Sequence, residues 1–456
     1  MPHRSPAAGG FAFVPSLRAA PVCLRALCDV RLGFAVKTIA LQLYRLAVVA
    51  VIAWLLRDLA LRQRTHRDSP ITVDEIKSLL PTAATLRPDT SARDGLFVLD
   101  RAEKEIGYVV RTQPYCRDII GYCGVTDALV VLGADWKIIG ITVHHSDDTK
   151  DHVRDVVTDR RFLKKWNGLT WDGAAQLNLK EAGIEGVSGA TMTSMAIAES
   201  VKARLQLSAG EIAARPPLRL GWRDWGMFAV LATAAAMAFG PAEWRNRWRW
   251  PYRLVLIGYV GFVSGDLVAQ GLLAGWARGG IPWSTAPGLV LLTAAALLVP
   301  WATRKPFYCH HVCPHGAAQE WISRVRPARW QIVLPASVGR GLGVLPWALL
   351  AFVLVIALMA APFDLAGLEP FDAYLIRSAG IGTLVVAGVG LVASVFVPQA
   401  YCRFGCPTGA LLNFVRGRGA TDGFSARDAT ALGFVMLAAL IHWQYLPLIH
   451  WVKGVP

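Results

Sequence analysis

Charged residues are scarce in this chain. Only 17% of its 456 residues are Asp, Glu, Lys or Arg, whereas 54% are hydrophobic and the mean hydropathy is +0.40. A soluble protein is rarely so apolar, so the composition predicts a membrane protein. Basic residues outnumber acidic ones, 47 against 32, which gives a net charge of +15. The arginines cluster beside apolar runs, as in the cytoplasmic loops of membrane proteins, and this pattern argues against nucleic-acid binding.

The N-terminal region has one long apolar run and no small-residue cleavage site after it. The run, residues 38–57, is interrupted near its start by Gln42 and Arg45. We expect it to span the membrane, with Arg45 extending back to the inner surface. Basic residues precede the run, which predicts that residues 1–37 form a loose cytoplasmic arm. Because no cleavage site follows, we expect an uncleaved anchor.

Between positions 58 and 223 charge returns, and no apolar run is long enough to span a membrane. Residues 71–80 read as a helix with Thr72 as its cap. Alternating apolar residues predict two strand pairs, and helical patterns follow them. The strands are expected at 96–99 with 106–110 and at 128–132 with 138–143, and the later helices at 151–166 and up to about Leu207. This pattern predicts an α+β domain.

Six further apolar runs occupy residues 224–456. They cover residues 225–240, 254–276, 286–301, 345–361, 381–397 and 429–448. Arg and Lys are concentrated in every second loop, so all basic loops fall on the side of the N-terminus. We therefore predict a membrane protein with seven spans, made of an N-terminal transmembrane anchor, an extracytoplasmic α+β domain and a six-helix transmembrane domain. The N-terminus is expected in the cytoplasm and the domain at 58–223 in the periplasm.

Small and hydroxyl residues meet at Ser188-Gly189-Ala190-Thr191, just before a helical pattern. Small residues allow a bulky ligand to approach the backbone, and a helix start offers free N–H groups to a phosphate. A capped helix that follows a glycine turn explains the same pattern without a ligand. The residues alone leave both interpretations open.

Two cysteine pairs form an internal repeat, each within the pattern Tyr-Cys-x-x-x-Cys-Pro. They are Cys309 with Cys313 and Cys402 with Cys406. The predicted topology places all four on the cytoplasmic side, where four thiolates can bind an iron–sulfur cluster or a zinc ion. Reduced cysteines that pack as small apolar residues are the alternative. Nearby histidines are expected to hydrogen-bond to the ligands, with metal ligation as the alternative. They are His310, His311 and His315.

The segment that ends at Thr191 resembles the S/T-G-A-T flavinylation motif of bacterial redox proteins. In that family the last Thr carries FMN through a phosphoester bond. The resemblance therefore implies covalent FMN on Thr191 and a flavin transferase of the ApbE type as a partner. Glu185 stands where the motif often has Asp. The neighbouring residues are expected to contact the cofactor. They are Ser188, Gly189, Ala190, Thr193 and Ser194.

Residues 120–124 and the strand after them resemble the FMN-binding domains of the same proteins. That family often has a Gly-Tyr-x-Gly turn and then a strand that ends near a histidine. The resemblance implies that Tyr122 and His145 contact the flavin ring or its phosphate, and metal ligation by the histidine pair is the alternative. Cys116 and Cys123 lie in this domain, and the sequence does not decide whether they form a disulfide in the periplasm.

The arrangement from about residue 35 to 450 resembles the NosR/NirI family of membrane flavoproteins, and its cysteine half resembles the NapH type of quinol-linked proteins. We expect the short, PceC-like form that lacks a C-terminal ferredoxin domain. The resemblance implies an electron-transfer flavoprotein, or oxidoreductase component, of the bacterial inner membrane. A cytoplasmic ferredoxin-like protein or a quinol would be the donor. Covalent periplasmic FMN would serve an extracytoplasmic reductase or maturation system.

Two other functions remain open. One is a redox-responsive regulatory or assembly factor for a respiratory enzyme, and the other is a zinc-stabilised transport protein. Electron transfer also meets a difficulty, because the cluster and the flavin would lie on opposite faces of a hydrocarbon core about 30 Å thick. An intermediate carrier, a bound quinone or a buried position of the cluster is therefore needed.

Overall fold

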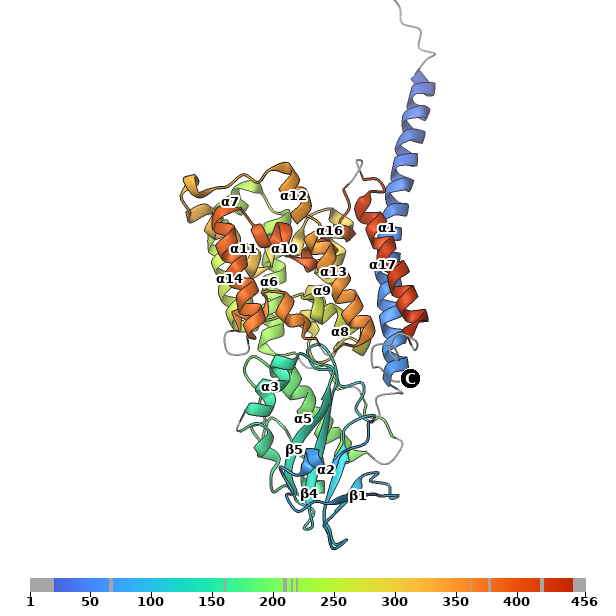
Figure 1. The fold of residues 1–456 in the computed structure, drawn as a ribbon. Helices are drawn as coiled ribbons and strands as arrows, with labels where there is room; N and C mark the ends of the chain where they lie inside the picture. Colours follow the sequence, from blue (N-terminus) through green and yellow to red (C-terminus); the bar gives the residue numbers. More distant parts are fainter. Residues whose placement is uncertain are drawn as a thin grey trace, which may run out of the picture.

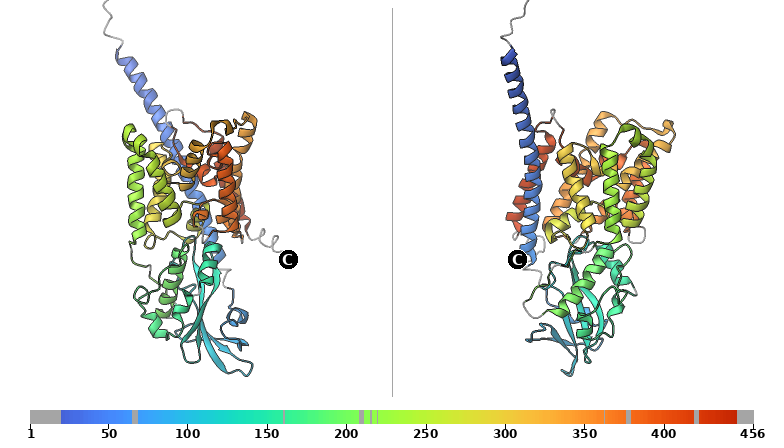
Figure 2. Two further views of the ribbon diagram at one scale, coloured as in Figure 1. Left: turned by 90° about the vertical axis from the view of Figure 1, so that its left-hand side faces the viewer. Right: turned by 180° about the vertical axis from the view of Figure 1, so that it is seen from behind.

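The computed structural model describes residues 20–64, 69–159, 161–207, 211–214, 216–218, 220–361, 363–375, 379–418 and 422–445. It has two parts, a bundle of helices and an α+β domain that packs against one end of the bundle (Figures 1 and 2). The first helix, α1 (Ala20–Arg64), runs along the bundle and extends beyond it at the end away from the α+β domain.

A five-stranded antiparallel sheet forms the centre of the α+β domain, and its strands are neighbours in chain order. They are β1 (Thr85–Pro88), β2 (Leu96–Leu99), β3 (Glu105–Arg111), β4 (Thr126–Gly133) and β5 (Ile138–Ser146). Every residue of β4 is buried, because apolar clusters cover both faces of the sheet. The two predicted strand pairs are confirmed as β2–β3 and β4–β5. The edge strand β1 was not predicted.

The helices of this domain only partly follow the prediction. They are α2 (Val73–Ile76), α3 (Lys150–Thr158), η1 (Leu163–Trp166), α4 (Trp171–Ala175) and α5 (Thr191–Gln206). Thr72 precedes α2, which is shorter than expected. The prediction of one continuous helix over 151–166 is wrong, because α3 and η1 are separate there. There Asp159 Oδ1 accepts the N–H groups of Arg161 (2.9 Å) and Phe162 (2.8 Å), a local alternative that ends the helix.

The other helices form the bundle. They are α6 (Trp222–Phe239), α7 (Ala242–Val255), η2 (Leu256–Ser264), α8 (Gln270–Gly279), α9 (Pro287–Thr303), α10 (Phe307–His311), α11 (Pro314–Val325), η3 (Ala328–Trp330), α12 (Ala336–Leu342), α13 (Leu345–Met359), η4 (Leu365–Leu368), η5 (Asp372–Tyr374), α14 (Ile381–Phe396), α15 (Ala400–Phe404), α16 (Pro407–Val415) and α17 (Ala426–Trp443). In the described part of the chain, Lys37–Gln63 and Ala336–Met359 are long and apolar enough to cross a membrane, and α9 and α14 are shorter apolar helices. Five of the six predicted runs coincide with a helix, and the number of spans stays a prediction.

The apolar run predicted as one helix over 254–276 is broken. Helix α7 continues directly into the π-helix η2, which ends at Ser264, and Gly265 then adopts a left-handed conformation with φ of 70°. The chain is not helical again until α8 begins at Gln270. Average hydropathy does not reveal this break, because most residues on both sides of it are apolar.

Two predictions for α1 are wrong. The helix begins at Ala20, within the segment expected to be a loose arm, and the residues before it lie outside the described part. Arg45 does not extend to the surface, since it is fully buried. Its guanidinium lies 2.7 Å from Asp422 Oδ2 and 2.8 Å from Asp428 Oδ1. Two carboxylates neutralise it inside the protein, so it has no need to reach water.

Candidate functional site

Helix α5 begins at Thr191, the predicted FMN attachment residue. Gly189 turns the chain into this helix with φ of 88°, a left-handed conformation that glycine adopts readily. A Cβ on Gly186 would lie 2.4 Å from Thr191 Cγ2, so this glycine allows Thr191 to pack against the turn. The Thr191 hydroxyl donates to Val187 O at 3.2 Å, and the side chain is only partly buried. An accessible hydroxyl is thus held at a helix start, where the dipole favours a phosphate.

The other predicted residues of this segment have different surroundings. Ser188 is exposed beside the attachment residue, whereas Ala190 is buried. Ser194 is fully buried, and its hydroxyl donates to Ala190 O at 2.8 Å and accepts from Val187 N at 2.9 Å. Ser194 therefore stabilises the turn and does not face a ligand.

A buried carboxylate, Asp148, joins α5 to the predicted flavin-binding turn. Its Oδ2 accepts from the Thr193 hydroxyl at 2.7 Å and from Tyr122 N at 3.0 Å. Its Oδ1 accepts from Cys123 N and Thr149 N, both at 2.8 Å. Four donors therefore use the acceptor capacity of one carboxylate and fix the spacing between the turn and the helix. Asp148 was not selected from the sequence as a site residue.

The two histidines at the end of β5 point to different partners. His145 is exposed, with Nε2 3.4 Å from Asp147 Oδ1. It lines a cavity of about 370 Å³ between the α+β domain and the bundle, which Asp148 also lines. His144 instead contacts α2, where its Nδ1 lies 2.7 Å from Glu75 Oε1. The structure therefore leaves His145 near Asp148 and does not form a metal site from the pair.

A third histidine, His152 of α3, has unused hydrogen-bonding capacity. Its residue is 4% exposed, and neither ring nitrogen has a partner among the described residues. The ring packs edge-to-face against Tyr122 with centroids 5.0 Å apart, and α3 packs on α5. A buried imidazole without a partner is costly, and a flavin ring offers both donors and acceptors. His152, together with the accessible Thr191 hydroxyl at the start of α5, fits an FMN site. No sequence motif marked His152.

Cys116 and Cys123 are both free and buried. The Cys116 thiol donates to Ser200 O at 3.3 Å, whereas Cys123 Sγ accepts from the Thr149 hydroxyl at 3.4 Å. They contact different elements and form no disulfide. Burial raises the pKa of the Cys116 thiol to about 12, and it also raises the pKa of Cys123 well above its ordinary value.

The four repeat cysteines line one cavity of about 430 Å³. They are Cys309, Cys313, Cys402 and Cys406. The second cysteine of each pair caps the helix that follows it, α11 or α16. Gly316 N donates to Cys313 Sγ at 3.4 Å, and Gly409 N donates to Cys406 Sγ at 3.1 Å. The repeat seen in the sequence is therefore also a repeat in local structure.

Gln319 links the two halves of this cysteine site. Its Nε2 donates to Cys402 Sγ at 3.1 Å, and its Oε1 accepts from Ser394 Oγ at 2.8 Å and from Tyr401 N at 3.2 Å. The neighbouring His315 is buried, and its Nδ1 lies 3.1 Å from Tyr374 Oη. Gln319 was not predicted. Its position shortly after the first cysteine repeat is the only sequence signal that could have identified it.

The donors around the cavity fit an iron–sulfur cluster. N–H groups that donate to sulfur stabilise negative charge on cysteine ligands. Within the part of the chain that the structure describes, no three His, Cys, Asp or Glu side chains lie close enough together to hold a single metal ion. Because a cluster is larger than one ion, cysteines spaced around a cavity fit a cluster better than tetrahedral zinc.

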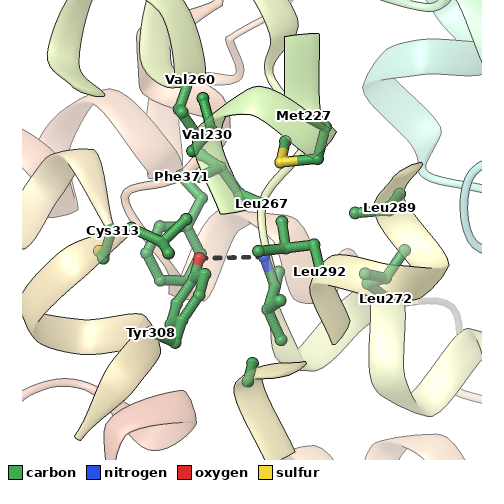
Figure 3. Packing of buried hydrophobic residues seen from close by; sticks show 14 of the residues in the cluster. Met227, Val230, Val260, Leu267, Leu272, Leu289, Leu292, Tyr308, Cys313 and Phe371 are labelled. Atoms are coloured by element: carbon green, nitrogen blue, oxygen red, sulfur yellow. Dashed lines mark hydrogen bonds between the residues drawn. The ribbon is translucent and has the colours of Figure 1, made fainter. Parts of the chain in front are cut away.

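One apolar core extends from the α+β domain to the cysteines. Tyr122 and Cys123 belong to the same cluster of buried residues as Cys313 and Cys406. Figure 3 shows Cys313 in this cluster close to Tyr308. The two parts also approach closely at Gly275 of α8, where a Cβ would lie 2.2 Å from Cys123 O. Packing therefore fixes the candidate FMN site against the bundle.

The break after η2 lies between the two sites. The Tyr122 hydroxyl donates to Leu267 O at 3.4 Å, and Trp276 Nε1 donates to Tyr122 O at 3.0 Å. Val268 N donates to Tyr308 Oη at 3.0 Å (Figure 3). Tyr308 directly precedes the first repeat cysteine. None of these bundle residues was selected from the sequence.

Two protein-family models match the chain, one at each candidate site. Residues 121–206 match the FMN-binding domain, and residues 285–332 and 379–422 match the 4Fe-4S binding domain. The first match contains Asp148 and Thr191, and the second contains all four repeat cysteines. The cofactors of this chain are therefore FMN and an iron–sulfur cluster.

Among curated proteins, the chain is similar to the "Putative electron transport protein YccM" of Escherichia coli (strain K12). The two are 26% identical over 242 residues, which cover 48% of this chain and 66% of that protein. No solved structure matches the chain.

Proposed function

We propose that this chain transfers electrons across a bacterial inner membrane, between the iron–sulfur cluster and FMN bound at the start of α5. Both groups carry electrons, and the similar Escherichia coli protein is described as an electron transport protein. One observation carries the proposal. The peptide group between Leu267 and Val268 connects Tyr122, beside the FMN site, to Tyr308, beside Cys309.

This connection reduces the difficulty posed by a thick membrane. Two hydrogen bonds and one peptide group separate the hydroxyls of Tyr122 and Tyr308, a path of roughly 9 Å. Burial raises the pKa of Tyr122 well above its ordinary value, so its hydroxyl stays protonated and donates to Leu267 O. We propose that this path forms part of the route between the two cofactors. A quinol remains an alternative to a ferredoxin-like donor.

The proposed topology has seven crossing elements, with the α+β domain in the periplasm. They are α1, α6, α7 with η2, α9, α13, α14 and α17. The third crossing element covers 242–264 and replaces the run at 254–276. The apolar helices α1, α9, α13 and α14 and the alternation of basic segments support this arrangement. The donor then approaches the cysteine end, and an extracytoplasmic acceptor approaches the flavin.

We also propose that FMN is attached to Thr191 by a phosphoester bond, which a flavin transferase of the ApbE type would form. Attachment suits a flavin that must not diffuse away from the periplasmic face. Thr191 supplies the hydroxyl, and Asp148 holds α5 against the turn at Tyr122. His152 offers ring nitrogens to the flavin. The bound cofactors supply the electron chemistry, while these residues supply position.

The test uses the full chain co-expressed with a flavin transferase. Mass spectrometry is expected to find an FMN-sized increment on the peptide that contains Thr191, and this increment should be lost in Thr191→Ala. Rapid mixing with a reductant should then reduce the flavin in the intact protein and much more slowly in Cys309→Ser, which should also lose iron. An unmodified Thr191 peptide would sink the attachment. Equal flavin reduction with and without the cluster would sink electron transfer, and redox-dependent partner binding without sustained flux would favour a regulatory role.

A further inference from the structure

A second cavity, of about 290 Å³, lies beside the cysteine site and shares Pro306 and His310 with it. It is formed by α7, the end of α6 and the first cysteine repeat, at the end of the bundle away from the α+β domain (Figure 1). Its lining residues with charged or titratable side chains are Arg245, Arg249, Arg253, Lys305, His310 and His311, together with Tyr252.

The cavity has more positive charge than its surroundings neutralise. Arg245, Arg249 and Arg253 are four residues apart, so they share one face of α7. Of the residues that the structure describes, no Asp or Glu lines the cavity. One nearby acid, Glu320, pairs with both Arg249 and Arg253. Among the described residues, neither Arg245 nor Lys305 has an acidic partner, so the cavity is suited to an anion.

Arg253 gives a second, independent indication of a ligand. The residue is only 7% exposed, and one terminal nitrogen, Nη1, has no hydrogen-bond partner among the described residues. The other, Nη2, lies 2.6 Å from Glu320 Oε2. A guanidinium cannot lose its proton, and leaving a buried N–H unpaired is costly. A phosphate oxygen in the cavity would accept this bond, and arginine suits phosphate geometry.

The same helix has the surface that a lipid requires. Trp244 and Trp248 are exposed at the level of the cavity, as interface residues of membrane proteins are. Leu254 and Val255 are more than half exposed further along the helix, toward the middle of the bundle. A basic cavity above an exposed apolar face matches a headgroup above acyl chains.

We propose that this cavity binds the phosphate group of an anionic phospholipid, with the acyl chains along Leu254 and Val255. The site requires the membrane placement proposed above but not electron transfer. It also places the phosphate beside His310 and His311, which lie between two cluster ligands.

The test is a lipid titration of the full chain, purified in detergent and freed of phospholipid. Native mass spectrometry counts bound phosphatidylglycerol and bound phosphatidylcholine with the same acyl chains, and inorganic phosphate forms a third arm. Phosphatidylglycerol is expected to bind more tightly than phosphatidylcholine. Arg245→Gln should weaken its binding about fivefold, the effect of one basic residue, whereas Arg245→Lys should keep it. Arg329→Gln, an exposed basic residue outside the cavity, is the matched control and should change nothing.

Equal binding of the two lipids by the unmodified protein would overturn the site. If Arg245→Gln and Arg329→Gln weaken phosphatidylglycerol binding equally, general surface charge explains the binding and the cavity site is contradicted. Inorganic phosphate that competes as well as phosphatidylglycerol would show that free phosphate is the ligand and would overturn the lipid. Flavin reduction is measured on the same samples. If the flavin is reduced at the normal rate but the two lipids bind equally, only the lipid site is contradicted. If phosphatidylglycerol binds more tightly but the flavin is not reduced, only the electron-transfer function is contradicted.

Discussion

Tyr122 and Tyr308 hydrogen-bond to opposite sides of one peptide group, that of Leu267 and Val268. In an α-helix both peptide atoms would bond within the helix. Here the chain leaves the helix at Gly265, so Leu267 O and Val268 N are available to the two tyrosines. The break after η2 therefore creates the contact between the FMN-binding domain and the cysteine site.

Replacing Tyr308 with Phe should slow reduction of the flavin by the cluster. The variant leaves Val268 N–H buried without an acceptor, which should also cost about 1–3 kcal/mol of stability. Rapid-mixing spectroscopy measures the rate, and iron and FMN contents should be unchanged. Tyr259→Phe is the matched control, because its hydroxyl donates to Arg223 O at 3.3 Å, away from this path. Equal rates in the two variants would contradict a role for the Tyr308 contact.

Asp148→Asn should loosen the FMN site. The amide replaces one of two acceptor oxygens with a donor that faces N–H groups, so we expect a loss of at least about 2 kcal/mol in stability. Thermal unfolding of the full chain measures this loss, and flavin attachment to Thr191 should fall with it. Asp147→Asn changes the adjacent carboxylate, whose partner His145 is exposed, and should have little effect. Full flavin attachment in Asp148→Asn would contradict the proposed role.

His152→Phe should change the properties of the bound flavin and leave the stability of the fold unchanged. Neither ring nitrogen has a partner within the described protein, so the flavin-free chain should lose no hydrogen bond and no stability. In the FMN-loaded protein the absorption spectrum and midpoint potential should change, because a hydrogen-bonding group beside the ring is removed. His152→Asn keeps a hydrogen-bonding side chain, so its spectrum and midpoint potential should lie between those of the unmodified protein and those of His152→Phe. An unaltered spectrum and potential would place His152 outside the flavin site.

Arg45→Ala should destabilise the bundle by about 3–5 kcal/mol, because it leaves two buried carboxylates without their cation. Denaturant unfolding of the full chain measures the change. Arg87→Ala removes a pair with Glu105 in which both side chains are about half exposed, and its cost should stay below about 1 kcal/mol. Similar costs for the two variants would show that burial does not strengthen the Arg45 contacts.

Cys116 should resist alkylation in the folded protein. Burial raises its pKa to about 12, so at pH 8 only about one thiol in ten thousand is ionised. Raising the pH toward the pKa increases the thiolate fraction tenfold per unit, and the labelling rate should rise accordingly. Mass spectrometry after iodoacetamide treatment measures the label, with urea-unfolded protein as the fully reactive control. Rapid labelling at pH 8 would contradict the buried position.

Local sequence patterns predicted the parts of the fold that depend on local structure. Alternating apolar residues identified β2 to β5, and the Tyr-Cys-x-x-x-Cys-Pro repeat brought four cysteines to one cavity. The short edge strand β1 was missed because it has a single partner strand and ends in Pro88. The helix end at Asp159 was missed because it depends on one side chain that bonds its own backbone.

The contacts between distant segments were not predictable in the same way. Asp148 joins helix α5 to the turn at Tyr122, and the Tyr122 hydroxyl donates to a backbone carbonyl 145 residues away in the sequence. No periodic pattern encodes such pairs. Average hydropathy also treated Gly265 as part of a continuous helix, although its left-handed backbone separates η2 from α8.

The buried contacts of Arg45 have a consequence for how the protein is made. Its partners, Asp422 and Asp428, are synthesised more than 370 residues later. If the chain crosses the membrane as proposed, the first helix must therefore wait during translation in the lipid, or beside the insertion machinery, with an uncompensated cation. The Arg45 contacts are complete only when the last described helix arrives, so a chain that ends before Asp422 would keep a buried cation without either carboxylate.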